Sequence, residues 1–163
     1  MTGRARSAWR PALAGAGAAI AVGALGAVVT DIGPWYYALK KPSWQPPDWL
    51  FGPVWTLIFG LAALAGVLAW RNADGRDAHA RIVVLFVVNA ILNVGWSWLF
   101  FRLHRPDFAL YEVGFLWLSI VALIVGLYPY SRTSSALLLP YLAWVTFAAA
   151  LNLTIVRLNP AVS

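Results

Sequence analysis

The stretch IVVLFVVNAILNVGWSWLFF at residues 82–101 runs for twenty residues without a charged side chain. Twenty residues in an α-helix extend about 30 Å, which matches the thickness of the hydrocarbon core of a bilayer. The hydrocarbon core of a membrane holds no water that could hydrogen-bond to the backbone. A helix pairs its backbone N–H and C=O groups with one another and so needs none. This stretch therefore predicts a membrane-spanning helix.

Four further apolar stretches have the length of a membrane span, and segments rich in proline, glycine or charge separate them. They lie near residues 11–30, 50–70, 108–130 and 134–156. Strands of a membrane barrel would instead cover about ten residues each, with alternating polarity. We therefore expect an all-α integral membrane bundle of five transmembrane helices. One domain over residues 1–163 would form it, with short connections and one longer loop at residues 31–49.

The composition agrees with a membrane protein. Of the 163 residues, 61% are hydrophobic and 11% are charged, whereas soluble domains are nearer half apolar and a quarter charged. The net charge of +6 comes from 12 Lys and Arg against 6 Asp and Glu. Basic loops beside anionic lipid headgroups explain this balance, so we expect a lipid bilayer and no nucleic acid as partner.

Thiol and metal chemistry are not expected. The chain has no Cys, and Met1 is its only Met, which excludes a disulfide framework, a thiolate metal site and a thiol nucleophile. His79 and His104 both lie in charged segments between the expected spans. We therefore predict no metal site and no required cofactor.

The first apolar stretch has two interpretations. Three arginines within the first ten residues, followed by an Ala- and Gly-rich run, also resemble a secretory signal peptide. The run continues to Thr30 and lacks a clean small-x-small cleavage site at its end, which favours a retained helix. Gly15, Ala19 and Gly23 recur at every fourth position, a spacing that suits close helix packing, although low-complexity sequence explains it as well.

The distribution of basic residues predicts the orientation. The N-terminal segment and the second and fourth connections carry seven Lys and Arg, against five on the other side. Because cytoplasmic loops are enriched in Lys and Arg, this small excess favours a cytoplasmic N-terminus in a multi-pass protein.

The ten Trp residues fall into groups by position. Trp9, Trp49 and Trp70 stand at the ends of expected spans, where an indole suits the headgroup region. Others lie inside the expected spans, where they need lipid, protein or a ligand as neighbours. These are Trp55, Trp96, Trp98, Trp117 and Trp144.

Helical spacing places aromatic and amide side chains on shared stripes. The stripe of the third stretch has steps of three and four residues and comprises Asn89, Asn93, Trp96 and Phe100. Because amides are costly against lipid, this stripe is predicted to face the bundle. Similar spacing relates Trp55 to Phe59 in the second stretch. In the fifth stretch it relates Tyr141, Trp144, Ala148, Leu151 and Asn152.

These stripes have two interpretations. In the first they only pack the bundle, with Asn89, Asn93 and Asn152 forming interhelical hydrogen bonds of about 1 kcal/mol. In the second they line a site for a flat, mostly apolar ligand, which needs aromatic walls and one or two polar groups. The combination favours the ligand site, because helix interfaces without a ligand favour small residues over large rigid rings.

The loop before the second stretch is aromatic and rich in proline, and residues 35–55 read WYYALKKPSWQPPDWLFGPVW. Pro42, Pro46 and Pro47 exclude a plain helix and stiffen the backbone. A long loop of this kind can fold back as a cover over the end of the bundle. The alternative, an interfacial loop anchored by its Trp residues, explains the amphipathic composition but not the stiffness.

Three motifs carry a resemblance to a known family. They are W-Y-x-x-L-x-K-P-x-W-x-P-P-x-W at residues 35–49 with Trp55 after it, N-x-x-W-S-x-x-F-F at 93–101, and P-Y-L-x-W-x-x-F-A-x-x-L-N at 140–152. With these motifs in this order, the chain resembles the TspO/MBR family of tryptophan-rich sensory proteins and translocator proteins, which includes the peripheral benzodiazepine receptor. The resemblance covers nearly the whole chain, from the first stretch to Asn159.

The resemblance implies a homodimeric five-helix protein that binds porphyrins and, in some members, sterols or synthetic isoquinoline and benzodiazepine ligands. The ligand site that it implies has nine positions here: Trp35, Tyr36, Trp55, Asn93, Trp96, Trp144, Phe147, Ala148 and Leu151. Some bacterial members are credited with light-dependent breakdown of protoporphyrin, which implies Trp35 and Trp144 as catalytic residues if this chain does the same. The family's sterol stretch L-N-Y-x-x-x-R has Leu153 in place of Tyr here, which weighs against a sterol site of that type.

The residues and the resemblance together support a membrane receptor or sensor for porphyrin as the leading hypothesis. The macrocycle would stack on Trp and Tyr rings, with Asn93 as a polar contact and with Lys40 and Lys41 near the propionates. Metal-free porphyrin is expected over haem, because no His, Cys or Met lies inside an expected span.

Two other functions remain as alternatives. One is a light-dependent porphyrin-degrading enzyme, although the spans hold no conventional catalytic constellation and Glu112 reads as a helix-end or interface residue. The other is a small-molecule transporter, which the lack of mid-membrane charge and of internal repeats disfavours.

Overall fold

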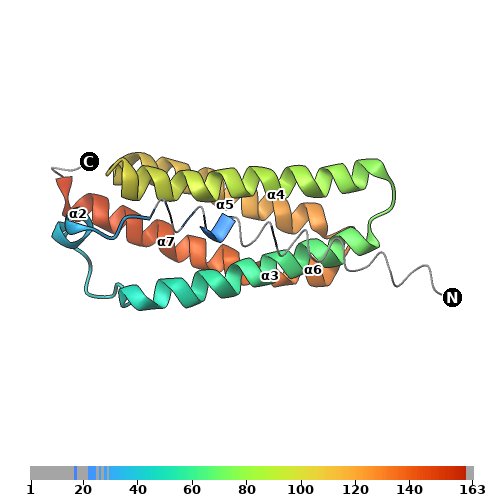
Figure 1. Ribbon diagram of the computed structural model, residues 1–163, viewed down its shortest axis with the longest axis horizontal. Coiled ribbons are helices and arrows are strands. Elements are labelled where there is room, and N and C mark those ends of the chain that lie inside the picture. The colour runs from blue at the N-terminus through green and yellow to red at the C-terminus, as the bar shows by residue number, and fades with distance from the viewer. Residues whose placement is uncertain (1–16, 18–21, 25, 27, 29, 161–163) are drawn as a thin grey trace.

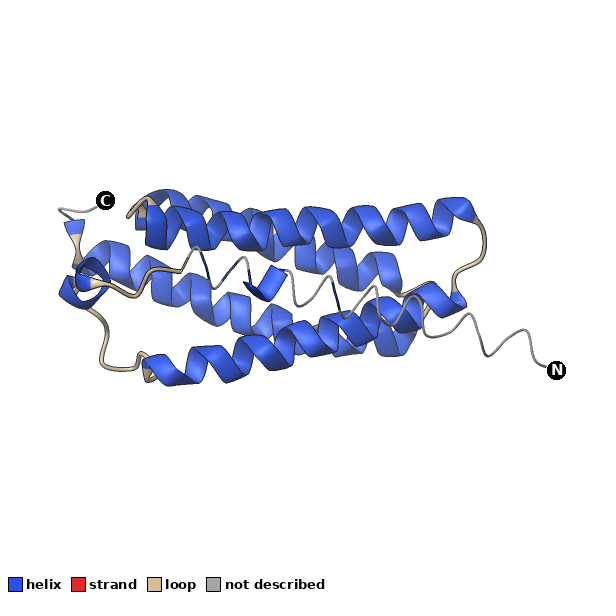
Figure 2. Cartoon of the chain, viewed as in Figure 1, coloured by secondary structure: helices blue, strands red, loops and turns tan. Residues whose placement is uncertain are grey.

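The computed structural model of the chain describes residues 17, 22–24, 26, 28 and 30–160. Within these residues all regular structure is helical, and Figure 2 shows long helices side by side, joined by loops at their ends. Four spans are long and apolar enough to cross a membrane: Asp48–Asn72, Arg76–Arg102, Pro106–Leu127 and Arg132–Leu158. They confirm the predicted all-helical membrane fold. Most of the expected span at 11–30, and Trp9, lie outside the described residues.

The long helices of the chain run back and forth through the bundle (Figure 1). From residue 51 on, the helical elements in chain order are α3 (Phe51–Asn72), α4 (Arg76–Ser97), the π-helical turn η2 (Trp98–Arg102), α5 (Pro106–Leu127), the short α6 (Arg132–Leu137) and α7 (Leu139–Leu158). Short connections force antiparallel neighbours, as in other helix bundles. The start of α3, the end of η2, the start of α5 and the end of α7 therefore meet at one end of the bundle.

Helix α4 begins at Arg76, earlier than the apolar stretch at residues 82–101 predicts. Gly75 has a φ of 83°, a left-handed conformation that glycine adopts at little steric cost, and it turns the chain just before the helix. The prediction that His79 lies in a connecting segment is therefore wrong, since His79 lies in α4. Its imidazole packs on Trp70, with 4.1 Å between ring centroids.

The fifth predicted span is divided into α6 and α7 at Leu138. Ser131 caps α6 by accepting a hydrogen bond from the backbone N–H of Ser134 at 3.1 Å. Pro140 stands in the first turn of α7, where its missing N–H has no partner to lose. Inside a continuous helix the same proline would remove a hydrogen bond and clash with the preceding turn. The break therefore follows from Pro140.

Helix α5 is the central helix of the described bundle, because it packs against α4, α6 and α7. Ile120, Leu123 and Leu127 on its inner face are fully buried. Gly126 lets α4 approach closely, since a Cβ at that position would lie 2.5 Å from Leu85 Cδ1. Helix α5 therefore forms the packed axis against which α4 and α7 place their side chains.

The two Trp residues that helical spacing did not assign have different surroundings. Trp98 is exposed on η2, in keeping with a neighbour outside the bundle. Trp117 on α5 donates its Nε1–H to Thr146 Oγ1 on α7 at 2.9 Å. Trp49 is exposed beside the start of α3, as its predicted place at the membrane interface requires. Trp98 and Trp49 therefore face outward, and Trp117 ties two helices together.

Candidate functional site

The loop at residues 31–49 lies at one end of the bundle, beside the end of α7 (Figure 1). It contains a short helix, α2 (Pro34–Ala38), with a proline in its first turn, and it ends in one turn of 3-10 helix, η1 (Asp48–Leu50), which leads into α3. Residues 39–47 between them are not helical, as their proline content predicts. The loop thus brings Trp35 and Tyr36 to the end of the bundle.

Tyr36 is buried, and its hydroxyl closes a ring of polar contacts within the loop. It donates to Asp48 Oδ1 at 2.8 Å, while Gln45 Nε2 donates to the Tyr36 oxygen at 3.1 Å and to Asp48 Oδ1 at 3.3 Å. Burial and the Asp48 carboxylate raise the pKa of Tyr36 well above its usual value, so the phenol stays protonated and continues to donate. Lys41 Nζ lies 3.7 Å from the centre of the Tyr36 ring. Tyr36 therefore holds the loop in its shape.

Asn159 fastens the loop to the end of α7. Its Oδ1 accepts from the backbone N–H of Lys40, and its Nδ2 donates to the Lys40 carbonyl, both at 2.9 Å. The same Nδ2 also donates to the Ile155 carbonyl at 2.8 Å. The side-chain amide thereby pairs with one residue of the loop in the way that two neighbouring strands pair. These bonds join segments 119 residues apart in the sequence.

Replacing Asn159 with Ala is expected to speed hydrogen exchange of the Lys40 amide by about tenfold, because each lost hydrogen bond contributes about 1 kcal/mol. Exchange of peptides around residues 39–41, followed by mass spectrometry, measures the change. Asn72→Ala, at the end of α3 and the opposite end of the bundle, is the control and should leave this exchange unchanged. Unchanged exchange in Asn159→Ala would show that the loop does not depend on this amide.

Trp35 belongs to an aromatic cluster built from three parts of the chain. Its indole stacks on the His104 imidazole, with 4.2 Å between centroids and 17° between planes, and meets the Phe100 ring edge-on at 6.0 Å. Phe100 in turn stacks on Trp96 at 5.3 Å. One apolar cluster joins Trp35, Tyr36, Trp96, Phe147 and Leu151. Five of the nine predicted site residues therefore come together here.

A second set of rings lies deeper, on α3 and α7. Trp55 meets the Tyr141 ring edge-on at 6.0 Å. Trp144 contacts Phe51 at 5.6 Å and Phe147 at 5.3 Å. Trp55 and Trp144 pack on the main core of the bundle, and Trp96 packs on both this core and the cluster around Trp35. Trp96 and Phe147 therefore both connect the two sets of rings.

A buried polar network crosses from α4 to α5 and α7. Asn93 Nδ2 donates to the Tyr141 hydroxyl at 3.0 Å, and that hydroxyl donates to Asn89 Oδ1 at 3.3 Å. Asn89 Nδ2 donates to Ser119 Oγ at 2.8 Å, and Ser119 donates to the Leu116 carbonyl at 2.7 Å. The predicted inward stripe of α4 is thus confirmed for both amides, whose Nδ2 groups are used inside the protein.

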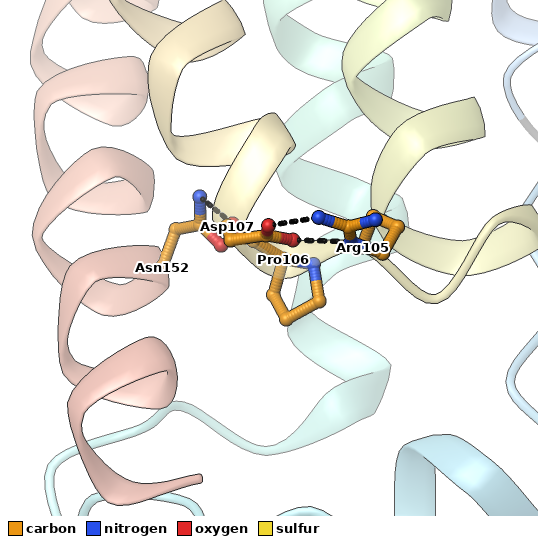
Figure 3. Close-up of polar contacts among 4 residues, drawn as sticks. All are labelled: Arg105, Pro106, Asp107 and Asn152. Carbon is orange, nitrogen blue, oxygen red and sulfur yellow. Dashed lines mark hydrogen bonds and ion pairs between the residues drawn. The ribbon is translucent and has the colours of Figure 1, made fainter. Parts of the chain in front are cut away.

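A further amide ties α7 to the start of α5. Asn152 Nδ2 donates to the Pro106 carbonyl at 3.3 Å, while Arg105 and Asp107 form an ion pair on either side of that proline (Figure 3). Asn152 Oδ1 is buried and has no hydrogen-bond donor among the described residues. The connection between η2 and α5 is therefore fixed both by its own ion pair and by α7.

Several buried polar atoms among these residues have no hydrogen-bond partner within residues 30–160 or the other described positions. Trp96 Nε1 and Trp144 Nε1 are two such donors, and both oxygens of Glu112 are such acceptors. Glu112 lies inside α5, two turns from its start, and Gly95 on α4 faces it, since a Cβ there would lie 3.8 Å from Glu112 Oε1. Of the two interpretations of Glu112, the helix-end one is wrong, and the interface one is confirmed because its side chain lies against α4. A buried donor without a partner is costly, so each one needs an explanation.

The structure thus places eight of the nine predicted site residues in ring contacts, apolar clusters or the polar network. Ala148 is half-buried on α7, where its small side chain lies one residue beyond Phe147. Sequence reasoning did not select His104 or Phe51 for the site, and it expected Tyr141 only to face inward. Nothing in the spacing of His104 indicates its contact with Trp35, because the two residues come from different connections.

Comparison with known proteins gives a consistent result. The model of the TspO/MBR family matches residues 15–158 of the chain. The tryptophan-rich protein TspO of Chlorobaculum tepidum is 44% identical over 150 residues, which cover 88% of this chain and 92% of the relative. TspO of Archaeoglobus fulgidus is 40% identical over 144 residues, 87% of this chain and 92% of the relative. The human translocator protein is 34% identical over 127 residues, 77% of this chain and 75% of the relative.

Proposed function

The chain belongs to the TspO/MBR family, and from this premise we propose that it is a membrane receptor for a porphyrin or another flat, mostly apolar ligand. The ligand binds among the aromatic side chains inside the bundle, beneath the loop at residues 31–49. Rings from the loop, α3, α4 and α7 converge there, through Trp35, Trp55, Trp96 and Trp144. Aromatic faces of this kind suit the planar surface of a tetrapyrrole.

The observation that carries the proposal is the pair of unpaired indole donors. Trp96 Nε1 and Trp144 Nε1 are buried among aromatic rings and have no acceptor among the residues that the structure describes. By contrast, Trp117 Nε1 is paired with Thr146 Oγ1. A ligand with acceptor atoms on an apolar body would satisfy both donors and remove the cost of leaving them buried.

The charges near the loop suit the acidic edge of a porphyrin. Lys40 is exposed beside the Asn159 contact, and Lys41 lies over the Tyr36 ring. Both ammonium groups are within the loop that covers the site, so either one supplies a partner for a propionate. Metal-free porphyrin is the better ligand, because the His104 ring lies flat on Trp35 and His79 packs on Trp70 away from the site.

A titration with protoporphyrin tests the proposal. The purified chain in detergent should give a saturable shift of the Soret band with one porphyrin per chain, and haem should bind no more tightly. Trp144→Leu should weaken binding by more than about tenfold, because it removes a ring contact as well as a donor. Trp70→Leu, whose indole packs on His79, is the matched control and should bind as the wild type does. Equal affinities for both variants, or no saturable shift in the wild type, would contradict the proposal.

A further inference from the structure

His104 stands in the short connection between η2 and α5, in an unusual backbone conformation. Its φ is 54°, and it is the one non-glycine residue with a positive φ in the described part of the chain. The left-handed region is unfavourable for side chains with a Cβ, and such conformations persist where the surrounding structure holds them in place. At a connection of this kind, glycine or asparagine would be the less strained choice.

The residues on both sides of His104 are held by hydrogen bonds and an ion pair. On one side the π-helical turn η2 ends with the Leu103 N–H bonded to the Trp98 carbonyl at 3.0 Å. On the other side Arg105 pairs with Asp107, and α7 holds the Pro106 carbonyl through Asn152 (Figure 3). π-Helical turns occur frequently at functional sites. The connection is therefore built to present His104 at one defined place.

The imidazole of His104 stacks on the indole of Trp35. The two rings are nearly parallel, with 4.2 Å between centroids and 17° between planes, which is the closest to parallel of the ring pairs described for this chain. Phe100, from η2, meets the same indole at 75° and 6.0 Å. One face of Trp35 is thus covered by the imidazole, while Phe100 limits rotation of the ring.

We propose that His104 is a positioning residue of the ligand site, which holds the indole of Trp35 so that a flat ligand stacks on the opposite face. This inference rests on the proposed function, in which Trp35 is a contact of a porphyrin. His104 itself does not touch the ligand in this arrangement. It acts by keeping Trp35 from turning into other rotamers, so that less conformational entropy is lost on binding.

Three variants separate the ring of His104 from its backbone conformation. His104→Asn keeps a residue that tolerates the left-handed region but removes the ring, and His104→Gly is a second ring-free variant that adopts this φ without cost. His104→Phe keeps an aromatic ring. His79→Asn is the matched control, because His79 packs on Trp70 at 4.1 Å near the other end of the bundle.

Two measurements are made on each variant. Hydroxyl-radical oxidation of the peptide that contains Trp35, quantified by mass spectrometry without ligand, reports how well the indole is held. Protoporphyrin titration reports affinity. His104→Asn and His104→Gly should raise Trp35 oxidation and weaken protoporphyrin binding, each by about three- to tenfold, as expected for the loss of one stacked ring pair. His104→Phe should restore both values, and His79→Asn should change neither.

The outcomes distinguish this inference from the function on which it rests. A wild-type chain without a saturable Soret shift overturns the proposed function. Wild-type binding, with unchanged affinity in the two ring-free variants, overturns the role of His104 alone. Unchanged oxidation of Trp35 in those variants overturns it as well, because the ring would then not be held by the imidazole.

Discussion

Replacing Tyr141 with Phe is expected to lower the free energy of unfolding by about 1–2 kcal/mol. The hydroxyl is buried between α4 and α7, where it accepts from Asn93 and donates to Asn89. Phenylalanine keeps the ring that contacts Trp55 but leaves both amides short of a partner. The cost therefore reflects two buried polar groups losing one shared partner, rather than a loss of packing.

Unfolding of the purified protein in mixed micelles, followed by circular dichroism as the denaturing detergent increases, measures this change. Tyr111→Phe is the matched control, because Tyr111 is 74% exposed on α5. The control should differ from the wild type by less than about 0.5 kcal/mol. If the two variants are equally stable, the network around Tyr141 does not contribute to the fold.

A double-mutant cycle shows how much of the lost stability comes from the hydrogen bond between Tyr141 and Asn89. In an Asn89→Leu background the donor hydrogen bond of Tyr141 is already lost, so Tyr141→Phe should cost less than it does in the wild type. Additive losses would mean that the Asn89 and Tyr141 side chains do not interact. This cycle also separates the network from the apolar core of α5, where Ile120 and Leu123 lie.

The order and approximate extent of the membrane spans in the described residues could be predicted from the sequence because a bilayer imposes a local rule. About twenty apolar residues make a span wherever they occur, and the stripe of Asn89, Asn93 and Phe100 turns inward because amides are costly against lipid. All three are buried in the structure. The start of α4 just after Gly75 could not be predicted from hydropathy. Charged residues extend this helix beyond its apolar stretch, and a hydropathy rule does not detect them as helical.

The partners of the site residues could not be predicted, since they depend on how the helices are rotated and where the connections end. The spacing of α4 shows that Asn93 faces inward, but only the packing of α7 makes Tyr141 its partner. The contact of His104 with Trp35 joins two separate connections, as the bonds of Asn159 to Lys40 join the loop to the last helix. No periodicity within one segment carries such information.

Removing both unpaired indole donors is expected to weaken protoporphyrin binding more than any other pair of conservative changes in the site. Trp96→Phe and Trp144→Phe each keep an aromatic ring but delete a buried N–H that has no acceptor in the described part of the chain. If each donor bonds the ligand, each variant should raise Kd about tenfold. The double variant should raise it about 100-fold, because Trp96 on α4 and Trp144 on α7 act independently. Fluorescence quenching and the Soret shift, titrated in parallel, give both values.

Trp117→Phe is the control that distinguishes the effect of losing the N–H donor to the ligand from the effect of losing indole volume. This substitution removes the same atoms as Trp144→Phe. The Nε1–H of Trp117, however, is bonded to Thr146 Oγ1 in the ligand-free protein. We therefore expect opposite patterns. Trp117→Phe lowers the free energy of unfolding and leaves Kd unchanged, since a hydrogen bond within the protein is lost. Trp144→Phe costs less stability, because it also removes an unsatisfied donor, and it raises Kd. A rise in Kd of equal size in both would mean that looser packing of α7, rather than a missing contact to the ligand, weakens binding.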